Sequence, residues 1–225
     1  MSQVVFLPGF DGRADLRREF LDGLAARHEV RAVTYPNRVL GTLDAYRDHA
    51  MAAAPVDWKP VLVAESFSGL VAARWAAVDS RVTAVVLCAA FARNPVGHAA
   101  FLAAAMPGLV KLGPAFGGPL AWISGDARRT RWGASLAKAL AELDDDVVAE
   151  RLRLIAREDV GPELSALRIP RLVVHFDSDL VIGPLARAHL ESVCRQPVVL
   201  RLKGPHFALE TRPAECAAAI GAALA

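Results

Sequence analysis

Residues 61–72 pass from an apolar strand pattern directly into a helix pattern, and Ser66 stands at the junction. A turn this abrupt is strained, so the residues two positions before and after the serine must be small for the two backbones to pass. Ala64 and Ser68 meet that requirement. The turn would place the Ser66 hydroxyl above the end of a sheet and direct the Phe67 N–H at a substrate oxygen, where the helix N-terminus also favours negative charge. The segment therefore predicts a serine nucleophile.

Taken alone, the pattern small-x-Ser-x-small is weak, because serine also caps ordinary helices. Two later segments strengthen it. Residues 172–182 form an apolar strand pattern followed by a turn with Asp177 and Asp179, and His206 lies in the loop after the last strand pattern. The order is therefore Ser, Asp, His, with each residue just beyond the carboxyl end of a predicted strand. Open α/β sheets bind ligands at that edge, so we expect a catalytic triad there.

Short β-branched runs alternate with longer helical patterns along most of the chain. This alternation is typical of a parallel sheet covered by helices on both faces, and continuous Val/Leu runs are typical of strands buried on both sides. The predicted strands are Val4–Leu7, Val30–Tyr35, Val61–Ala64, Val82–Cys88, Arg171–Phe176 and Val198–Leu202. The predicted helices are Asp15–Arg27, Leu43–Ala54, Ser68–Val78, Leu185–Val193 and Ala214–Leu224.

Residues 92–168 break this alternation, because they contain no convincing strand pattern. A compact domain rarely holds so long a connection unless it carries structure of its own. Its helical patches, separated by Pro and Gly, are Phe101–Ala105, Thr130–Leu140 and Asp144–Ile155. We expect one domain, in which residues 1–91 and 169–225 form the core and residues 92–168 form a helical cap inserted after the fourth strand.

Composition limits the possible classes of function. The 225 residues are 54% hydrophobic and 22% charged, which is enough for one domain with a large core. The net charge of +2, without a concentrated basic face, argues against nucleic-acid binding. No apolar stretch reaches the ~18 residues of a membrane span, and the N-terminus lacks a secretory signal pattern. Three cysteines without CxxC spacing favour a reducing compartment, so we expect a cytoplasmic enzyme.

These features resemble the α/β-hydrolase fold superfamily, including its serine esterase and thioesterase-like members, over nearly the whole chain. The segment from Phe6 to Gly12, Phe-Leu-Pro-Gly-Phe-Asp-Gly, looks like the family's HGxxG oxyanion loop. The resemblance implies that the backbone N–H of Phe10 joins that of Phe67 in binding the oxyanion. The family's first two strands are absent, so we expect six strands in the spatial order 2-1-3-4-5-6.

The acid turn resembles the family's G-x-x-D-x-(V/I)-x-P, which aligns Asp179 with the catalytic acid. Asp177 is then a turn former, since Asp side chains bond backbone N–H groups two residues on. His206 matches the family's G-x-H-F segment. The chain departs from the family at Pro8, where a His is usual, at Phe176, where a Gly is common, and at both elbow glycines.

No metal or organic cofactor is expected. His175 with the two following acids could suggest a metal site, but it lies inside a buried strand pattern and is more simply a core residue. Ser68 is expected to matter for its small size, and Glu65 is given no role beyond packing beside the strand end. Candidates for an apolar substrate pocket are Phe91, Trp122 and Val181. The basic run 128–131 could dock an acidic group or a carrier protein, although a solvated helix face explains it as simply.

The predicted function is that of a serine hydrolase acting through an acyl-enzyme. Because the predicted cap is rich in large apolar residues, we expect a small-molecule carboxylic ester with a small to medium apolar acyl or alcohol part. Acyl thioesterases and carbon–carbon bond hydrolases of the family share the same catalytic residues. The alternative from another class is a hydrolase fold that binds a ligand without catalysis. The oligomeric state is not predicted.

Overall fold

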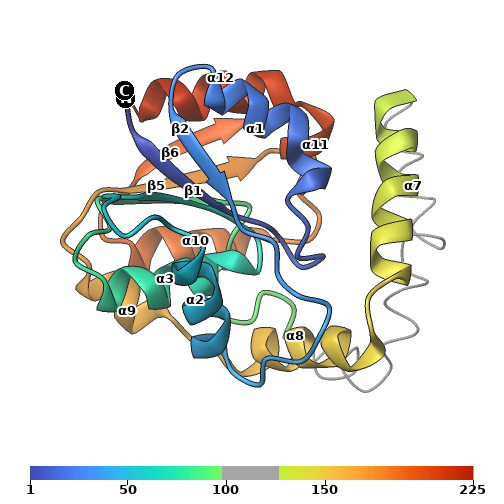
Figure 1. Ribbon diagram of the computed structural model, residues 1–225, viewed down its shortest axis with the longest axis horizontal. Helices are drawn as coiled ribbons and strands as arrows, with labels where there is room; N and C mark the ends of the chain where they lie inside the picture. The colour runs from blue at the N-terminus through green and yellow to red at the C-terminus, as the bar shows by residue number, and fades with distance from the viewer. Residues whose placement is uncertain (98–126, 225) are drawn as a thin grey trace.

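In the described part of the chain, six parallel strands form one sheet in the order β2-β1-β3-β4-β5-β6 (Figure 1). The computed structural model describes residues 1–97 and 127–224. The strands are β1 (Gln3–Leu7), β2 (Glu29–Ala32), β3 (Val61–Glu65), β4 (Ala84–Cys88), β5 (Arg171–Phe176) and β6 (Val198–Leu202). The predicted spatial order is confirmed.

The central strands β1, β3, β4 and β5 are almost wholly buried, whereas the edge strands β2 and β6 are largely or partly exposed. Two strands are shorter than predicted. β2 ends early because the chain turns toward the loop after β1, where the Tyr35 N–H donates to the Gly12 carbonyl. β4 begins late because Val82 still belongs to a turn, in which its N–H donates to the Asp79 carbonyl.

Helices cover both faces of the sheet (Figure 1). On one face, the short 3-10 helix η1 (Asp15–Arg17) packs with α1 (Arg18–Ala25), α11 (Ala208–Thr211) and α12 (Pro213–Ala223). The other face carries α2 (Leu43–Ala52), α3 (Ser68–Val78), α9 (Gly161–Ala166) and α10 (Pro184–Val193). The five helices predicted for the core are present. The first is split at Arg17, where the backbone leaves helical geometry (φ −103°, ψ 21°).

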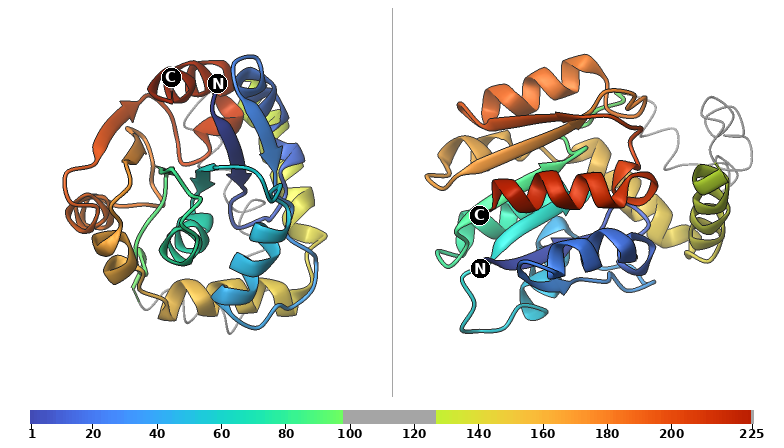
Figure 2. Two further views of the ribbon diagram at one scale, coloured as in Figure 1. Left: turned by 60° about the vertical axis from the view of Figure 1, so that its left-hand side comes forward. Right: turned by 90° about the horizontal axis from the view of Figure 1, so that it is seen from above.

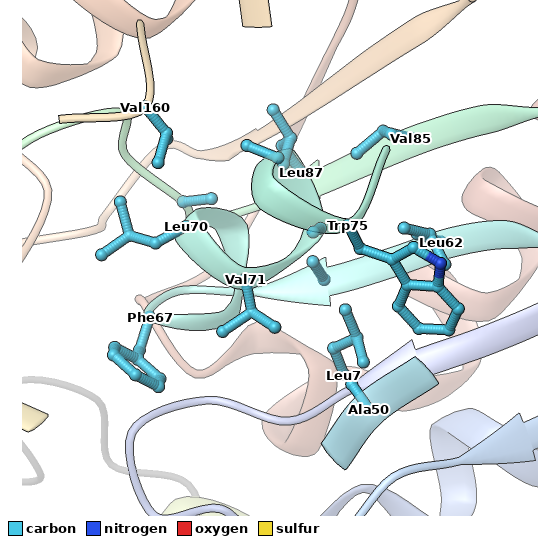
Figure 3. Close-up of a cluster of buried hydrophobic side chains, with 14 of the residues drawn as sticks. Leu7, Ala50, Leu62, Phe67, Leu70, Val71, Trp75, Val85, Leu87 and Val160 are labelled. Carbon is cyan, nitrogen blue, oxygen red and sulfur yellow. The ribbon is translucent and has the colours of Figure 1, made fainter. Parts of the chain in front are cut away.

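The helix α3 is fixed to the middle of the sheet by buried apolar side chains (Figure 3). Trp75 of α3 lies beside Leu62 of β3, and Val71 of α3 and Leu87 of β4 belong to the same core. Trp75 is wholly buried, and its indole N–H donates to Asp79 over 2.9 Å. The N-terminus of α3, which follows Ser66, is therefore rigidly placed relative to the sheet.

The described part of the insertion between β4 and β5 starts with a non-helical stretch up to residue 97. From residue 127 it consists mainly of the helices α7 (Ala127–Ala141), α8 (Asp145–Arg157) and α9. The predicted patches Thr130–Leu140 and Asp144–Ile155 are confirmed, while Phe101–Ala105 lies outside the described residues. The helix α9, which was not predicted, packs against α3 and α10. The helix α7 lies to one side of the helices that cover the sheet faces and contacts α11 (Figure 2). The division into a core and a cap of residues 92–168 stays a prediction.

Cys88, Cys194 and Cys216 are free and buried, as expected of core residues rather than of a disulfide framework. None of the described helices combines the length and the apolar character that crossing a bilayer requires.

Candidate active site

Ser66 occupies the turn between β3 and α3 with a φ of 51°, a left-handed conformation that costs a non-glycine residue about 1–3 kcal/mol. Its N–H donates to the Cys88 carbonyl over 2.9 Å, and α3 begins almost at once with Ser68. The helix lies so close to the chain after β4 that a Cβ on Gly69 would be 2.7 Å from the Cβ of Ala90. The strained turn that the sequence predicts is present.

His206, in the loop between β6 and α11, joins the serine to an acid. Its Nε2 lies 3.0 Å from Ser66 Oγ and its Nδ1 lies 2.9 Å from Asp179 Oδ2. The other oxygen of Asp179 accepts the N–H groups of Val181 (2.8 Å) and Ile182 (2.9 Å). Because an ionised carboxylate can only accept, Nδ1 carries the proton and Nε2 is left to accept the Ser66 hydroxyl. The three side chains form one continuous hydrogen-bonded chain.

The two acids of the turn after β5 have different surroundings. Burial raises the pKa of Asp179, but the hydrogen bond and charge of His206, with the two backbone N–H donors, outweigh burial and bring that pKa below its usual value. Arg187 also donates to the Asp179 carbonyl over 2.6 Å and fixes the turn. Asp177 instead accepts the Gly204 N–H over 2.9 Å. The structure therefore places Asp179, not Asp177, against His206.

Phe10 lies in the loop after β1, where the sequence predicts the oxyanion loop. A turn closes this loop, with the Gly12 N–H donating to the Gly9 carbonyl over 3.0 Å. Phe10 lines the same cavity as Ser66, and Phe67 directly follows Ser66 in the elbow. Within the described part of the chain, neither the Phe10 nor the Phe67 N–H has a hydrogen-bond acceptor. Two unpaired backbone donors beside a serine are what an oxyanion requires.

A cavity of about 230 Å³ opens beside Ser66 and His206, and most of its lining is apolar. Its charged lining residues, Asp11, Arg17 and Glu65, are paired with one another. The apolar walls come from the loops after β4 and β5 and from α7 and α8, and include Phe91, Leu136, Leu140, Leu152, Ile155 and Val181. The predicted pocket residues Phe91 and Val181 thus line this cavity, while Trp122 lies outside the described residues.

A sequence profile described as the alpha/beta hydrolase family matches residues 4–219. The chain belongs to this family. The match spans β1 to α12 and therefore includes every segment of the site. No curated protein matches the sequence of this α/β hydrolase significantly.

Solved structures similar to this α/β hydrolase include the enol-lactonase from Burkholderia xenovorans LB400, with a TM-score of 0.82 and 18% identity over 99% of this chain and 91% of that one. A hydrolase from Pseudomonas aeruginosa PA01 has a TM-score of 0.81 and 16% identity over 99% and 89% of the two chains. The bromoperoxidase from Bacillus anthracis has a TM-score of 0.79 and 18% identity over 99% and 91%. These likenesses show the fold.

Glu65, the residue before Ser66, does more in this α/β hydrolase than pack beside a strand end. It is 1% exposed, and its Oε2 accepts Arg17 Nε over 2.7 Å and the Gly9 N–H over 3.2 Å. Arg17 Nη1 also donates to Asp11 Oδ1 over 2.7 Å. This cluster was not predicted from the sequence. A carboxylate in an otherwise wholly apolar strand pattern could have indicated it, because charged residues are almost never fully buried unless they are paired.

Ser68 likewise offers more than small size. Its hydroxyl donates to the Pro8 carbonyl and lies 2.7 Å from the Tyr35 hydroxyl. The residue that replaces the family's second elbow glycine therefore links the elbow to the loop after β1.

His175 is buried in β5, with its Nε2 3.0 Å from Glu191 Oε1, and burial lowers its pKa. The prediction of a core histidine is consistent with this position. No group of three or more His, Cys, Asp or Glu residues among those described could hold a metal ion. The side chains of the basic run 128–131 are outside the described part.

Proposed function

We propose that the protein is a serine hydrolase that cleaves a carboxylic ester with a small to medium apolar acyl or alcohol part, using Ser66, His206 and Asp179. The observation that carries this proposal is the unbroken hydrogen-bonded chain between these side chains at the wall of an apolar cavity. Membership of the α/β hydrolase family supports hydrolysis as the reaction class. The free, buried cysteines suit a cytoplasmic location.

In the proposed reaction, Ser66 Oγ attacks the ester carbonyl while His206 Nε2 takes the hydroxyl proton. Asp179 keeps the imidazole in the required tautomer and stabilises its cation. The Phe10 and Phe67 N–H groups bind the oxyanion, each such donor typically contributing about 10²–10³ in rate. His206 then gives its proton to the leaving alcohol, which leaves the acyl group on Ser66. Water attacks this ester with His206 as base, and the acid is released.

The cavity supports an apolar group in the substrate, because most of its lining is apolar and its charged residues are already paired with one another. Drug-sized ligands occupy pockets of roughly 300–1,000 Å³, so a cavity of about 230 Å³ suits a smaller group. One structural relative is named an enol-lactonase. Since a lactone is a cyclic ester, an enol lactone belongs in the substrate panel.

The first test is intact-mass spectrometry after treatment with a fluorophosphonate, with Ser66→Ala as the matched control. We expect a single adduct on the wild type and none on the variant, because only a serine activated by His206 attacks phosphorus at a useful rate. The absence of an adduct on the wild type would contradict the proposed mechanism and favour a ligand-binding protein without catalysis.

The second test separates the bond types. Short p-nitrophenyl esters, an enol lactone, acyl thioesters and a carbon–carbon substrate are compared by kcat/KM. We expect the carboxylic esters to react fastest. Faster turnover of the thioesters or of the carbon–carbon substrate would replace the ester assignment while leaving the catalytic residues in place.

A further inference from the structure

Arg151 of α8 is a buried cation held by neutral groups. It is 0% exposed, and in the described part of the chain no carboxylate forms an ion pair with it. Its Nε donates to the Tyr46 hydroxyl over 3.1 Å, and its guanidinium carbon lies 5.6 Å and 5.7 Å from the ring centroids of Tyr46 and Tyr35. A buried charge costs several kcal/mol unless it is well compensated, and an apolar residue of similar volume often replaces one without loss of stability. Stability alone therefore does not explain an arginine at this position.

The shortest hydrogen bond that Arg151 makes in the described structure is with the candidate oxyanion loop. Its Nη1 donates to the Phe10 carbonyl over 2.6 Å. Gly12 closes the same loop with a φ of +75°, and a Cβ there would lie 2.8 Å from Arg151 Nη1. The loop backbone is thus shaped around the guanidinium.

The other side of Phe10 is held as well. The Gly9 N–H donates to Glu65 Oε2, and Glu65 is itself held by Arg17. The Phe10 N–H therefore lies between two anchored backbone groups, the Gly9 N–H before it and the Phe10 carbonyl after it. The Phe10 N–H shares a rigid peptide plane with the Gly9 carbonyl, which accepts the Gly12 N–H over 3.0 Å. Because this plane and the groups on either side of it are held, the direction of the Phe10 N–H has little freedom.

The same side chains also support the second candidate donor. The Phe67 ring packs edge-on against Tyr46, with centroids 5.3 Å apart, and against Tyr35 at 6.3 Å. Tyr35 also contacts Ser68 of the elbow through its hydroxyl. Arg151, placed on both tyrosine rings, thus connects the Phe10 loop with the Phe67 turn.

We propose that Arg151 is a positioning residue that orients the Phe10 N–H toward the oxyanion. A helix of the insertion thereby determines how strongly this N–H of the core binds the transition state. This inference rests on the proposed function, in which the Phe10 N–H binds the oxyanion. Substrate binds the apolar cavity in the ground state without help from that N–H. Loss of Arg151 is therefore expected to lower kcat and to leave KM nearly unchanged.

The test compares Arg151→Met and Arg151→Lys with the wild type on the best p-nitrophenyl ester. A mutation far from the chemistry that displaces a group of the site by about 1 Å can lower the rate ~10²-fold. We therefore expect kcat of Arg151→Met to fall about 10–100-fold, with KM within about threefold of the wild type. Arg151→Lys keeps the buried charge but lacks the planar fork, so we expect it to give an intermediate kcat. It also serves as the second variant if Arg151→Met fails to fold.

Arg74→Met is the matched control. Arg74 also joins the core to the insertion, through Glu158 (2.9 Å) and Glu163 (2.7 Å), but among the described residues it makes no hydrogen bond or ion pair with the candidate oxyanion loop. We expect its kcat to stay within about twofold of the wild type.

A second readout excludes a merely structural role. An aryl trifluoromethyl ketone forms a tetrahedral adduct with a reactive serine and so requires the oxyanion site. Its Ki is expected to rise by the same factor by which kcat/KM falls, while inhibition by the product acid stays unchanged. Wild-type kcat and Ki in both Arg151 variants, with Ser66 still labelled, would overturn this inference alone. A wild type that is not labelled at Ser66 would overturn the proposed function and this inference together.

Discussion

His206 has two partners that are 140 and 27 residues away along the chain. All three side chains follow the carboxyl ends of parallel strands, so the sheet brings them to one edge. Two aspartates stand in the turn after β5, and their geometry separates their roles. Asp179 faces the imidazole, while Asp177 holds the backbone of the histidine loop at Gly204.

Asp179→Asn is predicted to lower kcat by about 10³–10⁴ with little change in KM. The amide keeps an oxygen for the Val181 and Ile182 N–H groups but favours the wrong histidine tautomer, an effect of about this size in serine proteases. Steady-state kinetics on a p-nitrophenyl ester measures it.

Asp177→Asn is the control for that prediction, because an amide oxygen still accepts the Gly204 N–H. Its kcat should stay within about threefold of the wild type. If the two variants exchanged their effects, the assignment of Asp179 as the acid would be wrong.

At this scale the sequence was informative where a role follows from a local position. Ser66, Asp179 and His206 could be placed because each stands just after a recognisable strand. Glu65 and Arg151 could not, because their partners come from remote loops. Arg17 reaches Glu65 only when the β1 and β3 ends are adjacent, and no local pattern reports that adjacency.

Among the elements, α3 connects the site to the far edge of the sheet. It begins next to Ser66 and ends at its C-cap, Asp79. Asp79 accepts the Trp75 indole N–H over 2.9 Å and contacts Arg81 over 2.8 Å. The hydrogen bond from Arg81 is the largest influence on this carboxyl and lowers its pKa to about 2, from an ordinary 3.8.

A lowered folded-state pKa means that the ionised form stabilises the fold. This stabilisation is fully present above the unfolded value near 3.8 and is lost as pH falls toward about 2. Discounted for the partly exposed Arg81, it amounts to about 1–2 kcal/mol. Asp79→Asn should therefore be less stable than the wild type by this amount at pH 7, with the difference shrinking below pH 4. Urea unfolding at several pH values measures it, and a difference that is constant with pH would contradict the explanation.

Elements with a clear local pattern were predicted well, and the shortest helices were not. β5 and α3 agree with their predicted bounds, since β5 is buried almost throughout and α3 is buried from Ser68 to Ala73 and at Trp75. α9 and α11 have six and four residues, too few for a helical period to emerge, and they depend on packing against neighbours. The break at Arg17 also escaped prediction, since it depends on the side chain entering the interior.

Across the whole molecule, Arg17 joins segments that meet only in the folded chain. It contacts Asp11 in the candidate oxyanion loop, Glu65 beside Ser66 and Glu210 in α11, each over 2.7 Å. Arg17 Nε donates its hydrogen to Glu65. Although Glu210 lies at the same distance, neither of its carboxylate oxygens accepts a hydrogen bond in the described structure. Burial raises the pKa of Glu210 well above its usual value, although the nearby charge of Arg17 acts in the opposite direction.

Arg17→Met is predicted to lower the free energy of unfolding by about 3–5 kcal/mol, because it leaves Asp11 and Glu65 buried without their cation. Chemical denaturation at pH 7 measures the loss. Arg13→Met serves as the control, since Arg13 pairs with Asp15 and Glu142 at the surface and should change stability by less than about 1 kcal/mol. Equal losses in the two variants would refute a special role for the buried cluster.

The contacts of α8 also bear on how this enzyme can be recombined with its relatives. Glu150 of α8 accepts the backbone N–H groups of Leu40 and Gly41, and Arg151 donates to the Phe10 carbonyl. The helix α8 is therefore bound to the core through loops near the site. An exchange of the whole stretch 92–168 would import new pocket walls and discard both anchors together. A chimera joined between α7 and α8 would replace the part of the cavity wall that α7 forms. It would keep the native α8 and its contacts with Phe10, Leu40 and Gly41.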